Sequence, residues 1–457
     1  MEIALSKESK RKSPVAIAFR DGERTFGSEA LATGVKYPKA CYMNFLDLLG
    51  KTTDHELVQS FLKKFPYYTI VPCPDRNTVC FKHDEETTYS VEELVAMILT
   101  HAKVIAESFT NQKVKDAVIT TPVYFNQAER RALLSAADLA GINVLQLFNT
   151  PMATALNYGM FRRKDINTTA KYMMFYDMGS SATSASVVSF QVIKSKERGF
   201  TESHPQAQIL GLSYDRTLGG LELRIRVRNY LAEEFNKLGK TKTDVKKVDR
   251  AMGKLYKEAE RVKLVLSANT ECYAQVENLL EDIDFKLLVT REDLMKLSED
   301  YFVPDRITRP MVKALEASGL TMPEISEVVL MGAGTRVPKI QEVLLSYLDG
   351  RELGKSLNTD EASAMGSVYK AADLSSGFKV KKFITRDAVI LPIDVNFERH
   401  FEDDEGKPSK KTVNKALFAK MNPYPQKKIM TFNKFQDDFQ FHANLNNLDH
   451  LEKNEIR

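Results

Sequence analysis

The sequence predicts an α/β fold, and three observations support this class. Segments of helical spacing alternate with short β-rich segments along residues 91–148. Glycine-containing turns follow two apolar strands, at residues 177–181 and 332–336. The chain has 457 residues, of which 43% are hydrophobic and 28% are charged, the usual balance of a folded multidomain protein. Because strands that alternate with helices usually pair in parallel, we expect the strands within residues 91–148 to pair in parallel.

The first half of the chain alternates helix and strand. Apolar residues recur every three or four positions over 91–109 and 127–140, which predicts two helices, and Gly141 ends the second. The short apolar runs 117–120 and 144–148 predict the strands that follow these helices.

The second half repeats this pattern in outline. The apolar run 172–176 and the β-rich run 185–192 predict a strand, a turn and a second strand. Further along, we expect helices over 221–235, 248–267 and 359–372, and a strand that begins at residue 327 and ends on a glycine-rich turn.

The composition changes after residue 377, which predicts a domain boundary. Residues 378–387 are short and basic and are expected to be a linker. Residues 388–457 are β-rich without completing an obvious β-sandwich, and the charged stretch 402–411 is expected to be an exposed loop.

Charge and hydropathy exclude two classes of partner. The net charge is +4, and basic residues lie beside acidic ones instead of forming one stripe, so no nucleic-acid partner is expected. No apolar run approaches the length that spans a bilayer, so membrane insertion is not expected. The N-terminal stretch does not read as a secretory signal, which would leave the chain in the cytoplasm if that start is authentic. Asn167-Thr168-Thr169 is a lone glycosylation sequon, usable only in a lumen.

The cysteines indicate no metal site. Cys41, Cys73, Cys80 and Cys272 include no CxxC pair and no cluster with ligand spacing, so zinc is not expected. Cys73 and Cys80 could pair across a hairpin, but free thiols are the commoner state and are the expectation here.

Three glycine-containing turns are candidates for a phosphate site: Asp177-Met-Gly-Ser-Ser, Gly219-Gly220 and Gly332-Ala-Gly-Thr-Arg. Glycine lets the backbone approach a phosphate closely, and successive N–H groups in a tight turn bind anions. The carboxylate of Asp177 at a strand end could hold the waters of a Mg²⁺ ion. Each turn alone is more often just a turn.

Glu260, Lys263 and Ser267 form a second candidate group. Their spacings of three and four residues place the side chains on one face of the helix predicted over 248–267. Such a pattern most often indicates an exposed helix face with a local ion pair.

Taken in order, the motifs resemble the DnaK-type, seventy-kilodalton heat-shock chaperone family across nearly the whole chain. The segments that carry the resemblance are residues 120–126, 140–145, 149–151, 217–220, 260–263 and 332–341. Residues 125–131, 161–169 and 176–180, and Arg386 with the three residues after it, look most like the large endoplasmic-reticulum members of that family.

The resemblance implies a two-lobed, actin-like nucleotide-binding domain over residues 1–377, with lobe I over about 1–168, lobe II over about 169–355 and a closing helix over about 359–372. A partial substrate-binding β domain over 388–457 would follow the linker. It also implies ATP or ADP with Mg²⁺ as the cofactor. The implied nucleotide-binding residues are Asp177, Gly179, Ser180, Gly219, Gly220, Glu260, Lys263, Ser267, Gly332, Gly334, Arg336 and Asp360. Asp177 would also lie near the metal, through water.

Pro122 and Arg130 match the family's relay between the nucleotide and the polypeptide-binding domain. The implied function is that of an ATP-binding chaperone that holds unfolded polypeptides in the endoplasmic-reticulum lumen. It would assist a smaller chaperone of the same family there. Nucleotide exchange on that smaller chaperone is one form that this assistance could take.

The chain departs from the family pattern at several catalytic positions. The family opens with a strand and an Asp-Leu-Gly-Thr-Thr phosphate loop, whereas Met1-Glu-Ile resembles the strand after that loop, so we expect the first strand and first phosphate loop to be missing. A partial gene product or an alternative start is the simplest account. The family's loop lysine, two carboxylates, a threonine and an adenine-stacking arginine align with Leu46, Thr150, Ser184, Ala182 and Leu264.

These departures weaken the expected ATPase activity, because phosphoryl transfer depends on positioning and charge. Nucleotide binding is expected to survive better than turnover. Two alternatives stay open at this point: a sugar or acetate kinase on the same actin-like fold, and an interaction module that binds no nucleotide. The linker and the β-rich tail favour the chaperone over the kinase.

Overall fold

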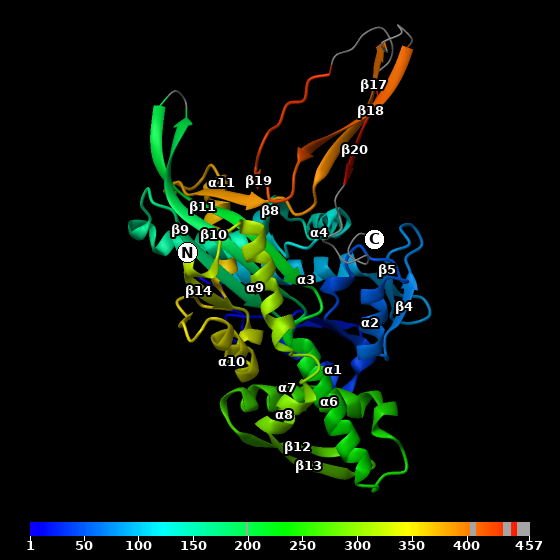
Figure 1. The fold of residues 1–457 in the computed structure, drawn as a ribbon. Helices are drawn as coiled ribbons and strands as arrows, with labels where there is room; N and C mark the ends of the chain where they lie inside the picture. The colour runs from blue at the N-terminus through cyan, green and yellow to red at the C-terminus, as the bar shows by residue number, and fades with distance from the viewer. Residues whose placement is uncertain (198–199, 403–407, 433–439, 446–457) are drawn as a thin grey trace.

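The fold was derived from a computed structural model that describes residues 1–197, 200–402, 408–432 and 440–445. Figure 1 shows a broad α/β body, a helical extension that ends in β12 and β13, and a β-rich segment that projects from the opposite end. The α/β class predicted from the sequence is therefore confirmed.

The elements up to residue 161 build the first part of the body. Its strands are β1 (Ala16–Arg20), β2 (Glu23–Phe26), β3 (Cys41–Met43), β4 (Thr69–Pro72), β5 (Val79–Lys82), β6 (Thr88–Ser90), β7 (Asp116–Thr121) and β8 (Asn143–Asn149). Its helices are α1 (Gly27–Lys36), α2 (Glu56–Lys64), α3 (Val91–Thr110), α4 (Gln127–Leu139) and α5 (Thr150–Phe161).

The elements from residue 171 to 374 build the second part. Its strands are β9 (Lys171–Met178), β10 (Thr183–Glu197), β11 (Phe200–Asp215), β12 (Glu271–Leu280), β13 (Ile283–Thr290), β14 (Ile325–Met331) and β15 (Leu353–Gly354). Its helices are α6 (Gly220–Lys237), α7 (Asp249–Ala268), α8 (Arg291–Leu297), α9 (Pro304–Ser318), α10 (Pro338–Tyr347) and α11 (Ala362–Leu374).

Local sequence explains why the predicted helices begin where they do. Ser90 and Glu93 form a capping box at the start of α3, and Asn126 and Glu129 form another at the start of α4. In each, two N–H groups that the helix itself cannot use receive a side-chain acceptor. Every helix expected from the sequence is present, with its ends shifted by a few residues.

The central sheet has the strand order β15-β14-β9-β10-β11-β16-β19, where β16 is Ile384–Ala388 and β19 is Pro423–Tyr424. The pairs β14–β15, β14–β9 and β11–β16 are parallel, whereas β9–β10, β10–β11 and β16–β19 are antiparallel. The strands predicted at 117–120 and 144–148 are β7 and β8, and they pair in parallel as expected. The central sheet is mixed, because β9, β10 and β11 form consecutive hairpins.

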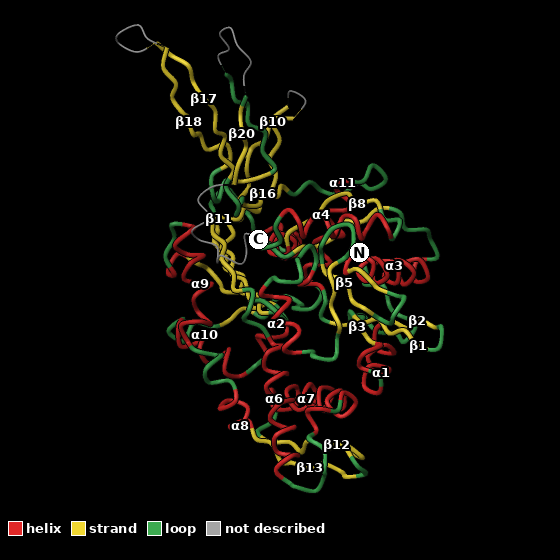
Figure 2. The backbone as a smooth tube through the Cα atoms, turned by 90° about the vertical axis from the view of Figure 1, so that its right-hand side faces the viewer, coloured by secondary structure: helices red, strands yellow, loops and turns green. Residues whose placement is uncertain are grey.

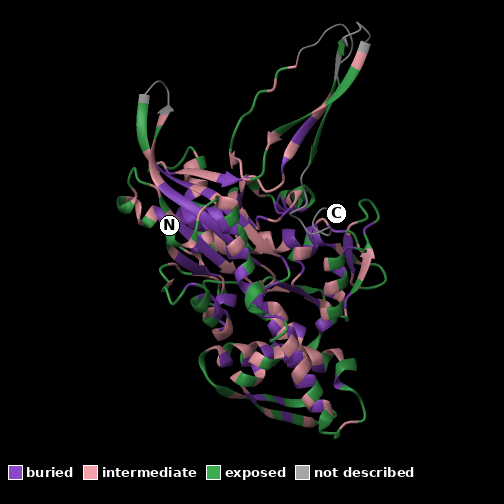
Figure 3. Cartoon of the chain, viewed as in Figure 1, coloured by how far each residue is buried: buried purple, intermediate pink, exposed green. Residues whose placement is uncertain are grey.

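Hydrophobic packing divides the body into two lobes. One core is built almost entirely from residues 16–140, and we call the part around it the first lobe. A second core is built from residues 174–348, and we call the part around it the second lobe. A third cluster joins α5 to the sheet. Figure 2 shows the helices and strands of the body from the side, and Figure 3 shows that strands in its middle are buried. The lobe boundary near residue 168 stays a prediction.

The predicted linker is partly a strand. Residues 384–388 form β16, which pairs in parallel with β11 through Gln206–Gln208, so this half of the segment belongs to the sheet. A sequence pattern cannot reveal such a pairing because the partner strand lies about 180 residues away. The remaining strands are β17 (Ile393–Glu402), β18 (Pro408–Phe418) and β20 (Phe441–Leu445), which form a three-stranded sheet.

The predicted loop over 402–411 is shorter than expected. Residues 408–411 belong to β18 and pair with β17, and residue 402 ends β17. Residues 403–407 lie outside the described residues, as does the polar C-terminal end predicted at 452–457. No helix in the described ranges is long and apolar enough to cross a membrane.

Cys73 and Cys80 form a disulfide, which corrects the expectation of free thiols. Their Cα atoms are 5.2 Å apart across the β4–β5 hairpin, a normal separation for a disulfide. The hairpin register pairs Val71 with Cys80, so the turn brings the two thiols together. Cys41 is free and buried, and Cys272 is free and partly buried.

Removing this disulfide should lower the free energy of unfolding of the first lobe. The bridge closes a short loop with a sequence separation of 7 residues, for which loop-closure entropy gives about 2 kcal/mol. Urea titration of the Cys73→Ser/Cys80→Ser variant measures this loss. Thiol counting under denaturing, non-reducing conditions is the control: two reactive thiols are expected in the wild type, and four would contradict the disulfide.

Candidate functional site

The three glycine turns predicted to bind phosphate meet in space. Strands β9 and β14 are parallel neighbours, with Met331 opposite Asp177. The turns that follow them, 179–182 and 332–336, therefore leave the sheet at the same edge. The Gly219–Gly220 turn, which starts α6, packs against the first of these. The sequence-predicted constellation of turns is present in the structure.

Two of these glycines are required because no side chain would fit. A Cβ atom on Gly332 would lie 2.3 Å from the Met178 carbonyl oxygen, and Gly332 has a φ of +74°. A Cβ atom on Gly219 would lie 2.3 Å from the Ser180 carbonyl oxygen. Contacts this short do not occur between real atoms, so the loops approach each other backbone to backbone.

Backbone hydrogen bonds fix the 179–182 loop to the start of α6. The N–H groups of Gly220 and Leu221 donate to the carbonyl oxygens of Gly179 and Ser180, at 3.0 and 2.8 Å. In the described part of the chain, the N–H groups of Ser180 and Ser181 have no acceptor. Two free adjacent N–H groups beside a helix N-terminus are the donors that a phosphate oxygen needs.

Asp177 is a buried carboxylate at the end of β9. Burial raises the pKa of Asp177 to about 6, and within the described ranges no cation or hydrogen-bond donor contacts it. An isolated buried carboxylate is unfavourable unless a cation is supplied from outside the chain. The described residues contain no group of three His, Cys, Asp or Glu side chains that could hold a metal ion, so a Mg²⁺ ion beside Asp177 would take its other ligands from water and phosphate.

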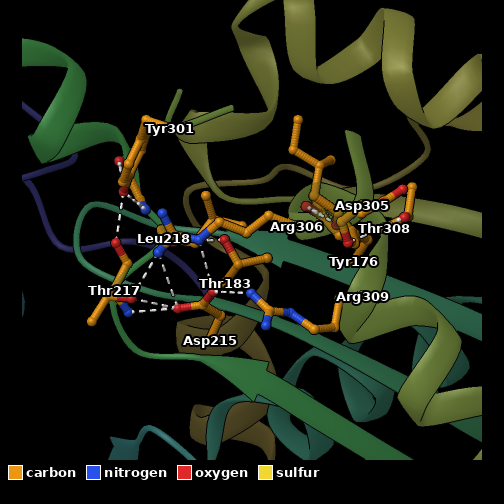
Figure 4. Close-up of polar contacts among 12 residues, drawn as sticks. Tyr176, Thr183, Asp215, Thr217, Leu218, Tyr301, Asp305, Arg306, Thr308 and Arg309 are labelled. Carbon is orange, nitrogen blue, oxygen red and sulfur yellow. Dashed lines mark hydrogen bonds and ion pairs between the residues drawn. The ribbon is translucent and has the colours of Figure 1, made fainter. Parts of the chain in front are cut away.

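A polar network anchors the segment that leads into the Gly219–Gly220 turn (Figure 4). The Tyr301 hydroxyl accepts from the Gly219 N–H at 2.7 Å and donates to the Thr217 carbonyl oxygen at 2.7 Å. Asp215 forms ion pairs with Arg306 at 3.1 Å and Arg309 at 3.4 Å. Burial alone would raise the pKa of Asp215, but Arg306 and the hydroxyl and N–H of Thr217 outweigh it and lower this pKa. This anchor could not be found from the sequence, because its members come from the end of β11, the residues just after it, and the α8–α9 region.

The predicted face of α7 is present. Lys263 forms an ion pair with Glu260 at 2.8 Å, and the Ser267 hydroxyl donates to the Lys263 carbonyl oxygen at 2.9 Å. Arg224 of α6 also approaches Glu260, at 3.5 Å. No hydrogen bond or ion pair between described residues joins this face to the 332–336 turn. The α7 face is thus formed, and no direct polar contact between described residues ties it to the 332–336 turn.

Arg336 and Asp360, both predicted at the nucleoside end, contact each other at 3.0 Å. Lys12 from the N-terminal segment binds the same carboxylate at 2.7 Å, and Arg11 binds the neighbouring Glu361 at 2.6 Å. Hydrogen bonds from Lys12 and Arg336 lower the pKa of Asp360. About half of the Arg336 side chain stays exposed.

The positions that depart from the family pattern supply no carboxylate or cation in the structure. Ser184 lies opposite Asp177 in the β9–β10 register, so no second carboxylate stands there. The Thr150 hydroxyl donates to the Thr121 carbonyl oxygen at 3.1 Å. The Ala182 carbonyl oxygen accepts from Gly179. Leu46 and Leu264 are exposed apolar side chains, which offer neither charge nor hydrogen bonds.

The predicted relay residues lie beside the β-rich segment. Arg130 donates to the side-chain oxygens of Thr121 and Asn149, at 3.0 and 2.8 Å. The Asn149 amide donates to the Tyr424 hydroxyl at 2.7 Å, so α4 reaches β19 in two contacts. Pro122 begins the turn before α4, where its carbonyl oxygen accepts from Phe125.

Comparison with known proteins agrees with this fold and shows the family. A family model described as Hsp70 protein matches residues 1–443. The chain therefore belongs to the Hsp70 family, whose members are chaperones.

Among individual relatives, the chain is 51% identical over its full length to the hypoxia up-regulated protein 1 of Xenopus laevis, of which it covers 70%. It is 50% identical to the protein of that name in Danio rerio and 48% identical to the one in Homo sapiens. It spans 46% and 45% of the lengths of these two relatives, about half of each.

Gly332→Ala should disrupt the candidate site by forcing the two strand-end turns apart. A suitable control is Gly350→Ala, because Gly350 has a nearly identical φ of +77° but open space where a Cβ would stand. Adopting this φ should cost the control about 1 kcal/mol, and the clash should cost Gly332→Ala at least about 2 kcal/mol more. Urea unfolding of both variants measures the difference, and equal losses would contradict the close approach.

Proposed function

We propose that this chain is an ATP-binding chaperone unit in which nucleotide controls the placement of the β-rich segment. The convergence of the turns at Gly179, Gly219 and Gly332 carries the proposal. Free N–H groups at Ser180 and Ser181, beside the start of α6, suit a phosphate chain. The partly buried α7 face and the half-exposed Arg336 suit the nucleoside end.

ATP or ADP with Mg²⁺ fits the residues present. Asp177 would hold the waters of the Mg²⁺ ion, Gly179, Ser180, Gly219 and Gly220 would approach the phosphates, and Gly332, Gly334, Arg336 and Asp360 would line the nucleoside end. Glu260, Lys263 and Ser267 would face the adenosine. When bound, Mg²⁺ neutralises charge on the phosphate oxygens.

Hydrolysis should be slow even where binding is strong. The γ-phosphate reacts through a transition state that is stabilised almost wholly by positioned charge. Leu46 supplies no cation, and Thr150 and Ser184 supply no carboxylate. The chain's own residues would therefore bind and orient the nucleotide but do little to stabilise the transition state. We therefore expect nucleotide binding to set the conformation of the chain, with little contribution from hydrolysis.

The β-rich segment after residue 388 is the proposed polypeptide-binding unit. It connects to the nucleotide-binding body through β16, and Arg130, Asn149 and Tyr424 join it to α4. This connection favours a chaperone over a sugar or acetate kinase, which would need no such strand. Unfolded polypeptides are the proposed clients, and a smaller chaperone of the same family is the proposed partner, with nucleotide exchange on it as the proposed service.

The disulfide between Cys73 and Cys80 supports the endoplasmic-reticulum lumen as the compartment. Disulfides persist in oxidising compartments and are rare in the cytosol. Asn167 of the sequon is exposed, as a lumenal glycan would require. Both observations suit a lumenal chaperone.

Mg-ATP should raise the midpoint of thermal unfolding. At a ligand concentration about a hundred times Kd, linkage gives about 2.7 kcal/mol, which corresponds to roughly 5 °C for a chain of this size. The Asp177→Asn variant should lose the Mg²⁺-dependent part of this rise, because it removes the only charge assigned to the metal side. Because the pKa of Asp177 is about 6, the Mg²⁺-dependent rise should grow between pH 5.5 and 7.5 in the wild type alone.

Asp138→Asn, an exposed change on α4, serves as the matched control for that experiment. Hydrolysis measured on the same samples should be negligible. No stabilisation of the wild type by Mg-ATP would refute nucleotide binding and leave the interaction-module alternative.

Acidification should strengthen the attachment of β16 to the body. Burial raises the pKa of Asp387 in this strand to about 6, above the ordinary value of 3.8. Folding therefore favours the protonated form, a stabilisation that is full below about pH 4 and lost as pH rises through about 6. The free energy of unfolding of the wild type minus that of Asp387→Asn should fall between pH 4 and pH 7 in urea titrations. A pH-independent difference would contradict this.

A further inference from the structure

Four charged side chains meet between the two lobes. Glu129, Lys51 and Asp47 come from the first lobe, and Arg216 comes from the second. Arg216 contacts the Glu129 carboxylate at 2.7 Å and Lys51 contacts it at 3.2 Å, with 1% to 5% of each of these side chains exposed. We call Asp47, Lys51, Glu129 and Arg216 the interlobe cluster.

The backbone of the first lobe is shaped to place two of these charges together. Gly50 has a φ of +65°, and a Cβ there would lie 2.9 Å from the Ala128 carbonyl carbon. The chain at Gly50 therefore touches the first turn of α4, which sets Lys51 beside Glu129. The other Glu129 oxygen accepts from the Asn126 N–H at 2.7 Å and so fixes the start of α4.

Arg216 is fixed from the second lobe. It lies between Asp215 and Thr217, which the network in Figure 4 anchors to α9 and Tyr301. It precedes Gly219 by three residues, so it belongs to the same short segment as the phosphate turn. Its guanidinium lies 4.5 Å from the centre of the Tyr124 ring, and its pair with Glu129 spans 87 residues of sequence.

The charges of the cluster balance only while the lobes are together. Two cations face two anions, so the buried sum is zero. Separating Arg216 from Glu129 would leave a buried charge without compensation on each side, which is strongly unfavourable. Burial also lowers the pKa of Lys51 and raises the pKa of Asp47, and Arg216 acts against the change at Asp47. A movement of Arg216 should therefore displace Glu129, and a movement of Glu129 should displace Arg216.

We infer that the Arg216–Glu129 salt bridge is a positioning contact through which the Gly219–Gly220 turn moves α4, and with it the hydrogen bonds that link Arg130, through Asn149, to Tyr424. The route runs from the phosphate turn through Arg216 and Glu129 to the next residue, Arg130. Arg130 then donates to the Asn149 side-chain oxygen at 2.8 Å, and the Asn149 amide donates to the Tyr424 hydroxyl at 2.7 Å. This inference rests on the proposed function, because the ligand that would move the turn is the nucleotide.

Three variants separate a positioning role from a merely structural one. Glu129→Gln preserves the cap of α4, since glutamine also serves in a capping box, but leaves the cluster at +1. Arg216→Gln leaves it at −1. The double variant restores a sum of zero, with Asp47 and Lys51 remaining. Both single variants should unfold at lower temperature than the wild type, and the double variant should recover most of the loss.

The decisive readout is the response to Mg-ATP. Hydrogen exchange at the amides of residues 384–388 and of Tyr424 should change by about tenfold on Mg-ATP addition in the wild type. In the double variant this response should disappear although the protein folds and still binds Mg-ATP. The exposed pair Glu233 and Lys246, 2.9 Å apart, provides the matched control as Glu233→Gln/Lys246→Gln, which should respond as the wild type does. A double variant that keeps the full response would overturn the inference.

A second measurement without nucleotide keeps the two proposals distinguishable. In the double variant, exchange should be about tenfold faster both at 216–220 and at 126–130, because each segment loses the partner that holds it. Unchanged exchange at either segment would show that the salt bridge does not link them. If the wild type shows no stabilisation by Mg-ATP, the proposed function fails, and this exchange result alone decides whether the link exists.

Discussion

The backbone contact between the turns that end β9 and β14 is the constraint on which the rest of the site depends. Because no side chain fits at Gly332 or Gly219, the second lobe presents three loops to one small volume. Asp177, the free N–H groups of Ser180 and Ser181, and the start of α6 all lie around that volume. Their positions follow from the strand order and the close approach, and not from contacts among their own side chains.

Much of this arrangement could be predicted from the sequence because it is encoded locally. A glycine turn after an apolar strand is visible in five residues, and the family pattern supplies the order of Asp177, Gly219 and Gly332. The face formed by Glu260, Lys263 and Ser267 follows from helical spacing alone. The capping residues before α3 and α4 likewise stand within three residues of the ends that they fix.

What could not be predicted depends on pairing between distant segments. The Cys73–Cys80 disulfide needs the register of a hairpin, and the strand at 384–388 needs an edge that β11 provides. Arg216 and Glu129 stand 87 residues apart, and each is an ordinary charged residue in the sequence. Only the folded chain shows that both are buried and that their neighbours Lys51 and Asp47 complete a neutral set.

The pairing of β16 with β11 has a consequence for solubility. Gln206–Gln208 would present unpaired N–H and C=O groups if β16 left the sheet, because β16 occupies that side of β11. An uncovered strand edge can pair with a strand from another molecule, which is the usual start of edge-to-edge aggregation. The strand β16, which joins the β-rich segment to the body, thus also covers the edge of β11. If β16 left the sheet for long, another strand would have to pair with β11 to prevent aggregation.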